Sequence, residues 1–118
     1  MVKILIVDDE PDIHFILKTA LKKEGYDIVE LSSGNECLMR IEEINPDLVL
    51  LDIEMPDISG WEVCKRIKES KLSVPVSMLS VRRSKESIEK SLDYAHADRH
   101  LTKPINIKEV ISTVKDLA

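Results

Sequence analysis

The chain has 118 residues, a length that fits one domain over residues 1–118 with one hydrophobic core. Its formal net charge of -5 excludes a general binder of nucleic acids or anionic membrane surfaces, because those ligands need a basic face. No apolar run approaches the roughly 20 residues of a membrane span, and the opening MVKILIVDD lacks a signal-peptide pattern. We therefore expect a cytoplasmic protein, in which Cys37 and Cys64 serve as small buried hydrophobes.

Short apolar runs alternate with amphipathic segments along the chain. Residues 3–7 (KILIV) predict a buried strand. Residues 11–25 then predict a helix with Pro11 in its first turn and Gly25 as its stop. The apolar face of this helix is predicted to consist of Ile13, Ile16, Leu17, Ala20 and Leu21. Residues 26–31 (YDIVEL) predict a second, more polar strand.

Two capping boxes mark the next helices. Ser33 and Glu36 open a helix whose apolar stripe consists of Leu38, Ile41 and Ile44. A third strand is predicted at residues 47–52 (DLVLLD), which are apolar until the final aspartate. Ser59 and Glu62 form a second box, and the helix that follows is predicted to bury Val63 and Ile67.

The last third of the chain repeats the pattern. Residues 74–79 (VPVSML) predict a fourth strand, and residues 84–95 predict a polar helix held by Ile88 and Leu92. Residues 98–102 (DRHLT) predict a short, polar fifth strand. Asn106 and Glu109 then cap a final helix whose inner face is predicted to include Ile107, Val110, Ile111, Val114 and Leu117.

A strand followed by a helix, five times over, is typical of an α/β fold with a parallel sheet covered by helices on both faces. The continuous apolar runs at residues 4–7 and 48–51 suit strands buried on both sides. The polar strands at 26–31 and 98–102 suit the two edges. Ligands of such sheets bind at the carboxyl ends of the strands, so the polar residues there are the candidate site.

Five polar residues stand at those strand ends: Asp8, Asp9, Asp52, Ser80 and Lys103. Any one of them alone suits a cap or a turn. Together, the three carboxylates suit a hard cation with oxygen ligands, for which Mg²⁺ is the natural candidate. A lysine and a hydroxyl beside them are the donors that an incoming phosphoryl group needs. The sequence therefore predicts a magnesium site that handles a phosphoryl group.

Four stretches of the chain resemble the receiver domain of two-component response regulators: ILIVDDE, PDLVLLDIEMPDISGWE, VPVSMLSV and HLTKP. The resemblance covers essentially all 118 residues. It implies a flavodoxin-like fold like that of the chemotaxis response regulator, with a five-stranded parallel sheet of order 2-1-3-4-5. It also implies a phosphoacceptor that assists its own phosphorylation and dephosphorylation, not an enzyme that turns over a separate substrate.

The resemblance implies a role for each site residue. Asp52 would accept a phosphoryl group from a sensor histidine kinase or a phosphotransfer protein. Asp9, Asp52 and the backbone carbonyl of Glu54 would bind Mg²⁺, for which Mn²⁺ can substitute, and Asp8 would act through a metal-bound water. Lys103 would pair with a phosphoryl oxygen.

Further residues would shape the loops or carry the switch. Ser80 would hydrogen-bond the phosphoryl group, while Pro56 and Gly60 would shape the loop after the acceptor. Lys103 is followed by Pro104, where the family has a cis peptide bond. Phosphorylation would change the face made by the fourth helix, fifth strand and fifth helix. That face would bind a downstream effector protein, or an effector domain outside this chain, or a second copy in a phosphorylation-dependent dimer.

Three residues near the acceptor depart from the family pattern or vary within it. Val81 replaces the usual Ala or Gly, and its stiff side chain is predicted either to crowd the path to Asp52 or to point to solvent. Glu54 and Arg82 occupy positions that tune the lifetime of the phosphoryl group. Their opposite charges are predicted to pair over the site.

Other departures lie further away. His100 replaces the usual switch aromatic and is either a gating residue or a solvated histidine of an edge strand. His96 replaces a glycine before the fifth strand, and Arg99 replaces an acidic residue of the subfamily that dimerises through this face. Trp61 is predicted to be a partly buried anchor of its helix.

Three other functions compete with this interpretation. A metal-dependent phosphatase with an aspartate nucleophile would place a second Asp where this chain has Glu54. A degenerate receiver that acts only as a binding module would lack some of the five strand-end residues. A nucleotide-binding domain is excluded, because neither G-x-G-x-x-G nor G-x-x-x-x-G-K-[ST] occurs.

Overall fold

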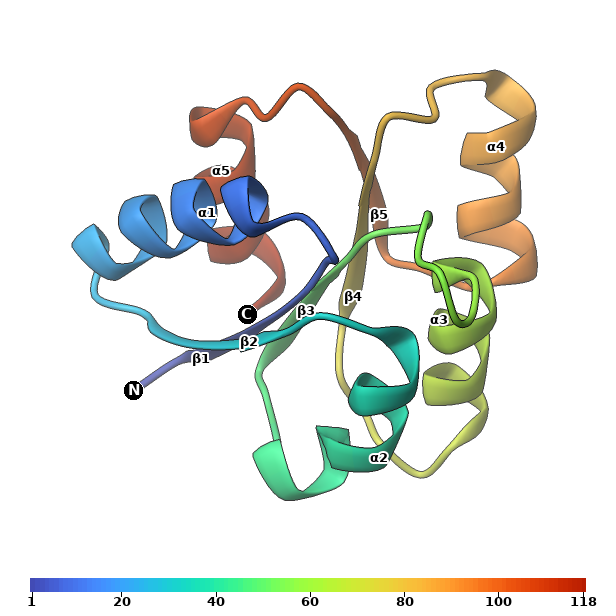
Figure 1. Cartoon of the computed structure of the whole chain (residues 1–118), viewed down its shortest axis with the longest axis horizontal. Coiled ribbons are helices and arrows are strands. Elements are labelled where there is room, and N and C mark those ends of the chain that lie inside the picture. The colour runs from blue at the N-terminus through green and yellow to red at the C-terminus, as the bar shows by residue number, and fades with distance from the viewer.

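The computed structural model describes residues 1–118 and contains a single five-stranded parallel sheet between two layers of helices (Figure 1). The strands run in the order β2-β1-β3-β4-β5, which confirms the predicted fold class and the two polar edges. Their bounds are β1 (Lys3–Val7), β2 (Asp27–Leu31), β3 (Leu48–Leu51), β4 (Val76–Ser80) and β5 (Arg99–Thr102).

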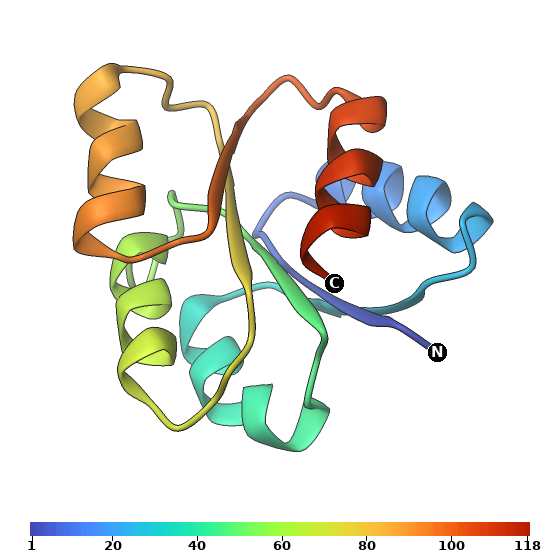
Figure 2. The ribbon, with the colours of Figure 1, turned by 180° about the vertical axis from the view of Figure 1, so that it is seen from behind.

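Figures 1 and 2, seen from opposite sides, show two helices on one face of the sheet and the others on the opposite face. The first pair is α1 (Pro11–Lys23) and α5 (Ile107–Leu117). The opposite face is covered by α2 (Gly34–Ile44), α3 (Gly60–Glu69), α4 (Lys85–Glu89) and the π-helical turn η1 (Lys90–Tyr94). No helix has both the length and the apolar content that crossing a bilayer requires.

The hydrophobic core is divided by the sheet into two layers. Successive side chains of a strand point to opposite faces, so Ile4 and Ile6 of β1 pack on the α1 and α5 side. Leu5 and Val7 pack on the side of α2 and α3. The free thiols of Cys37 and Cys64 lie in this second layer, where burial raises the pKa of both to about 12. Their predicted role as small hydrophobes is confirmed.

The helix starts follow the predicted caps with two corrections. The Ser33 hydroxyl accepts the Glu36 backbone N–H, so Ser33 caps α2 as predicted, but the Glu36 carboxylate accepts from that hydroxyl and not from the Ser33 backbone N–H of a full capping box. The Asn106 side chain accepts the backbone N–H of Glu109, as expected. Ser59 does cap α3, but it accepts from Trp61 N. The predicted box with Glu62 is therefore wrong, and that carboxylate accepts from the Tyr94 hydroxyl instead.

The buried face of α1 is rotated from the predicted one. Leu17 and Leu21 are fully buried as expected, but Ile16 is 41% exposed. His14 occupies the inward position near the start of the helix. In this inward position the buried His14 ring bonds the carbonyl of Asp8 just before the helix.

The helix predicted over residues 84–95 changes character halfway. Its second half is the π-helical turn η1, which the Ala95 N–H closes by bonding the carbonyl of Lys90. This wider turn brings Ser91 and Ala95 inward and leaves Leu92 40% exposed, so Leu92 does not hold the helix as predicted. His96 follows with φ of 60°, a left-handed conformation that histidine adopts more readily than most residues other than glycine. The turn into β5 is thus retained without the usual glycine.

Candidate functional site

Four carboxylates meet where β1 and β3 end. One carboxylate oxygen each from Asp8, Asp9, Glu10 and Asp52 lies within 4.8 Å of all the others. Asp8 and Asp52 are buried, whereas Asp9 and Glu10 are exposed. The structure thus brings together the three predicted acidic residues and adds Glu10, for which the sequence suggested no role.

The ammonium group of Lys103 enters this cluster from the end of β5. Its Nζ lies 2.9 Å from Asp8 Oδ2, 3.1 Å from Glu10 Oε1 and 3.5 Å from Asp52 Oδ1. Burial by itself lowers the pKa of this lysine, but its hydrogen bond to Asp8 and the charge of Asp52 outweigh that effect and raise the pKa. Lys103 is therefore a fixed cation that partly offsets the carboxylate charge.

The Asp52 carboxyl is buried, and its pKa is raised. Burial, and next the Asp8 carboxylate, raise its pKa from 3.8 to about 6, against the opposing effects of Lys103 and the Glu54 backbone N–H. At neutral pH the group is still mainly ionised. A buried carboxylate with few hydrogen bonds retains lone pairs that are available for nucleophilic attack or for a metal.

Both oxygens of the Asp8 carboxylate accept hydrogen bonds from the protein. Its Oδ1 accepts the backbone N–H of Glu10 at 2.9 Å, and its Oδ2 accepts from Lys103. Asp9, by contrast, makes no side-chain hydrogen bond. This difference supports the expectation that Asp9 contacts a metal directly while Asp8 acts through water.

The loop after β3 is pressed tightly against the start of α3. A Cβ atom on Gly60 would lie 2.0 Å from the Asp52 carbonyl oxygen, so only glycine permits this approach. The Gly60 N–H also bonds the Ile53 carbonyl at 2.9 Å. Pro56 lies exposed in the same loop, and the Lys103–Pro104 peptide bond is cis, as the resemblance implied.

The segment after β4 contacts the loop after β3. Ser80 is the buried last residue of β4, and its hydroxyl accepts the Arg82 backbone N–H at 3.1 Å. The Arg82 side chain pairs with Glu54, as predicted, and lies over the Trp61 ring at 5.1 Å from its centroid. Val81 is 61% exposed, which favours the alternative that it points to solvent.

A chain of hydrogen bonds runs from the loop after β4 through His100 of β5 and Ser91 of η1 to Trp61 in the first turn of α3. His100 Nε2 donates to the carbonyl of Arg82, because a carbonyl can only accept, and its Nδ1 accepts from Ser91. The Ser91 hydroxyl in turn accepts from the indole N–H of Trp61. The His100 ring is therefore held at both nitrogens and is not freely solvated. Its role as a gate stays a prediction.

No sequence pattern pointed to Ser91, because a small polar residue within a helical segment has no distinctive spacing. Its partners come from α3 and β5.

The Arg99 side chain donates hydrogen bonds to Thr113 and Asp116 of α5. Trp61 is half-buried, which confirms its role as an anchor.

The carboxylate cluster fits Mg²⁺ by its chemistry. Every candidate ligand is a hard oxygen donor, and neither a thiolate nor an imidazole belongs to the cluster. Asp9 and Asp52 retain free lone pairs, and their charge exceeds what one lysine can neutralise. The arrangement suits a cation held by one or two carboxylates that leaves coordination positions for water or a phosphoryl oxygen.

Comparison with known proteins gives the same family for the whole chain. A family model described as "Response regulator receiver domain" matches residues 4–115. The alkaline phosphatase synthesis transcriptional regulatory protein PhoP of Bacillus subtilis is 40% identical over 114 residues, which are 96% of this chain and 47% of PhoP. The transcriptional regulatory protein TrcR of Mycobacterium tuberculosis is 33% identical over 98% of this chain and 45% of its own. This chain therefore spans about half the length of these curated relatives.

Solved structures resemble it throughout. The response regulator TrrA of Thermotoga maritima, in complex with Mg²⁺ and beryllofluoride, is 41% identical, with a TM-score of 0.89 and full coverage of both chains. A CheY-like receiver domain protein of Methanospirillum hungatei is 31% identical with a TM-score of 0.90, over 98% of this chain and 92% of that one. The sheet order, the acidic cluster with its buried lysine, and these matches lead to one conclusion: this chain belongs to the family of response regulator receiver domains.

Proposed function

We propose that Asp52 accepts the phosphoryl group through which this receiver domain signals. The observation that carries the assignment is its position: a buried carboxylate 3.5 Å from the Lys103 ammonium, in a cluster with Asp8 and Asp9. A phosphohistidine of a sensor kinase or a phosphotransfer protein is the expected donor, since receiver domains act in two-component systems.

The residues around Asp52 have complementary parts in this transfer. A bound Mg²⁺, held by Asp9, Asp52 and the Glu54 carbonyl with Asp8 behind a water, would supply positive charge to the phosphoryl oxygens. The Lys103 ammonium, which now pairs with Asp8 and Asp52, neutralises a further oxygen of the phosphoryl group. The gain in rate comes mainly from positioning and charge, because phosphoryl transfer passes through a loose transition state.

Ser80 connects the acceptor to the output face. Its hydroxyl holds the Arg82 N–H in the structure, and the same hydroxyl would bond a phosphoryl oxygen on Asp52. The loop after β4 would then move, and with it the face made by α4, β5 and α5. We propose that an effector protein, or an effector domain outside this chain, binds the changed face, and that it can support a phosphorylation-dependent dimer.

The test is direct phosphorylation of the full chain. We expect Mg²⁺ and a small phosphodonor to add the mass of one phosphoryl group, and we expect Mn²⁺ to replace Mg²⁺. The same incubation with EDTA should leave the intact mass unchanged. Labelling that proceeds equally well in EDTA would contradict a metal-assisted acceptor.

Magnesium should also raise the stability of the unphosphorylated protein. The metal binds a folded cluster that the unfolded chain does not have, so at 100 times its dissociation constant it contributes about 2.7 kcal/mol. The thermal midpoint should rise with Mg²⁺ concentration, and Asp9→Ala should remove that rise. A midpoint that ignores millimolar Mg²⁺ would show that the cluster does not bind the ion.

The exposure of Val81 determines what its truncation should do. Because most of this side chain faces solvent, Val81→Ala should leave the hydrolysis rate of phosphorylated Asp52 unchanged. Arg82→Ala, which breaks the pair with Glu54, is the informative companion and should alter that rate. Faster hydrolysis in Val81→Ala, measured by loss of the phosphorylated mass, would restore the steric role that the sequence suggested.

A further inference from the structure

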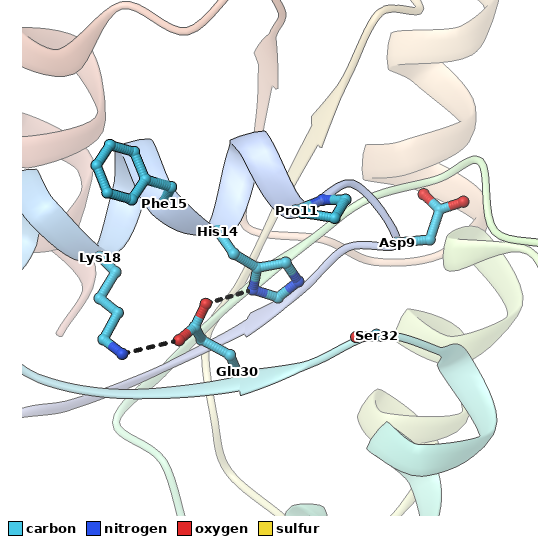
Figure 3. A pocket seen from close by; sticks show the side chains of 7 residues that line it. All are labelled: Asp9, Pro11, His14, Phe15, Lys18, Glu30 and Ser32. Atoms are coloured by element: carbon cyan, nitrogen blue, oxygen red, sulfur yellow. Dashed lines mark ion pairs between the residues drawn. The ribbon is translucent and has the colours of Figure 1, made fainter.

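A group of three charged or titratable side chains lies beside the carboxylate cluster, between α1 and β2. Figure 3 shows His14 and Lys18 of α1 directed toward Glu30 of β2. They line a hollow of about 420 Å³, and Asp9 lies at its other end. Pro11, Phe15 and Ser32 complete its walls. None of the three side chains belongs to the acceptor site described above.

His14 holds the backbone next to the predicted metal ligand. The ring is buried, and its Nε2 lies 2.6 Å from the carbonyl oxygen of Asp8. Because a carbonyl oxygen only accepts, Nε2 carries the proton of this bond. The backbone N–H of Asp8 donates to the Leu31 carbonyl at 3.2 Å. His14 therefore satisfies the remaining backbone polar group of Asp8, its carbonyl, at the point where β1 ends.

The other ring nitrogen faces an anion. Nδ1 lies 3.0 Å from Glu30 Oε2, the distance of an ion pair when the ring carries its second proton, and it has no hydrogen-bond partner. The second oxygen of Glu30 lies 3.3 Å from the ammonium of Lys18. Glu30 is opposite Ile6 in the ladder between β1 and β2, so the sheet fixes where this carboxylate stands. The ring is thus confined between a strand and a backbone carbonyl.

That carbonyl controls the direction of Asp9. The peptide group joining Asp8 to Asp9 is planar, so an anchored carbonyl oxygen also fixes the N–H of Asp9 and the plane from which its Cα departs. Asp9 has no side-chain hydrogen bond to orient it otherwise. The backbone therefore sets the direction in which this side chain leaves the chain. His14 holds that backbone from α1, beside the bond between Asp8 Oδ1 and the Glu10 N–H.

We propose that His14 is a positioning residue for Asp9, orienting this ligand toward the metal through the carbonyl of Asp8, with Glu30 as its support on β2. The inference rests on the proposed function, in which Asp9 binds Mg²⁺ directly. Residues behind a metal ligand fix its orientation, and their removal typically weakens metal binding by about 10- to 100-fold.

Isothermal titration of the full chain with Mg²⁺ alone tests this. His14→Ala should weaken binding about tenfold. His14→Gln should recover most of the loss, because its amide N–H can reach the same carbonyl. Leu17→Val is the matched control: it trims a buried residue on the same face of α1, away from that carbonyl, and should leave the affinity unchanged.

Glu30→Ala keeps the test informative if His14→Ala does not fold, since this carboxylate is partly exposed at the sheet edge. It should weaken Mg²⁺ binding in the wild-type background and have no further effect beside His14→Gln, whose side chain lacks the ring nitrogen that Glu30 faces. Unchanged affinity in Glu30→Ala, or in His14→Ala where that variant folds, would overturn the inference, provided that Asp9→Asn still weakens binding. If wild type itself does not bind Mg²⁺, the proposed metal site fails and the role of His14 fails with it.

Discussion

Asp52→Asn should abolish phosphorylation by a small phosphodonor in the presence of Mg²⁺. The substitution keeps the size of the side chain but removes the nucleophilic oxygen and one of the predicted metal ligands. Intact mass after incubation is the measurement, and we expect no phosphorylated species for the variant. Asp57→Asn is a suitable control, because this exposed carboxylate caps α2 and should leave labelling intact. A variant at position 52 that is labelled at the wild-type rate would place the acceptor elsewhere.

The same variant should be more stable than wild type without metal, with a gain that depends on pH. The folded-state pKa of Asp52 is about 6 and the ordinary value is 3.8, so the folded protein binds more protons between these limits. Wild type therefore loses stability as pH rises from about 4 to 6, by about 3 kcal/mol for a shift of this size.

Asparagine does not titrate, so the advantage of Asp52→Asn should appear across that interval and stay level at higher pH. Urea unfolding in EDTA at pH 4, 5, 6 and 7.5 measures it. An advantage of the same size at pH 4 and at pH 7.5 would show that the burial of the charge is not its cause.

Lys103→Met should lower both the stability of the protein and the rate of its phosphorylation. In the unphosphorylated protein without metal it leaves the buried Asp8 and Asp52 carboxylates without their cation. Removing one partner of a buried ion pair costs about 3 kcal/mol or more, so we expect a lower urea midpoint at pH 7. The loss of a charge aimed at the transferring group should also slow phosphorylation by about a hundredfold.

Magnesium separates the two effects of this variant. Added Mg²⁺ supplies positive charge to the same carboxylates and should recover much of the stability but little of the rate. Lys108→Met is the matched control, since it removes an equal charge from an exposed position of α5. Equal unfolding midpoints for the two lysine variants in EDTA would contradict the role of Lys103 as the internal counter-ion.

The fold and the five strand-end residues could be predicted because both depend on simple spacing. Continuous apolar runs mark strands that are buried on both faces, and the first polar residue after each run marks the end where parallel strands converge. Asp8 and Asp52 follow β1 and β3 directly, and Lys103 follows β5. The pattern therefore predicts the parallel sheet and the place of the site, while the strand order and the role of each residue came from the resemblance to receiver domains.

The corrections come from contacts that spacing does not contain. A helical stripe leaves the buried face uncertain by about one residue, and in α1 the inward position is taken by His14, a polar residue that bonds a carbonyl. The π turn at Lys90–Tyr94 adds one residue to a turn without any sequence signature, which moved Leu92 outward and Ser91 inward. Glu10 pairs with Lys103, which follows β5, and this contact between distant parts of the chain has no trace in local spacing.

The hydrogen bonds that link Ser80, Arg82, His100 and Ser91 have a thermodynamic consequence that runs in both directions. Suppose that a phosphoryl mimic such as beryllofluoride draws the Ser80 hydroxyl away and thereby increases the affinity of a partner for η1. Linkage then requires the partner to increase the affinity for the mimic by the same factor. A protein that binds η1 would thus raise the affinity of the acceptor site for the mimic without contacting that site. Partner binding at η1 would therefore change the affinity of the acceptor site by the same factor by which the mimic changes the affinity for the partner.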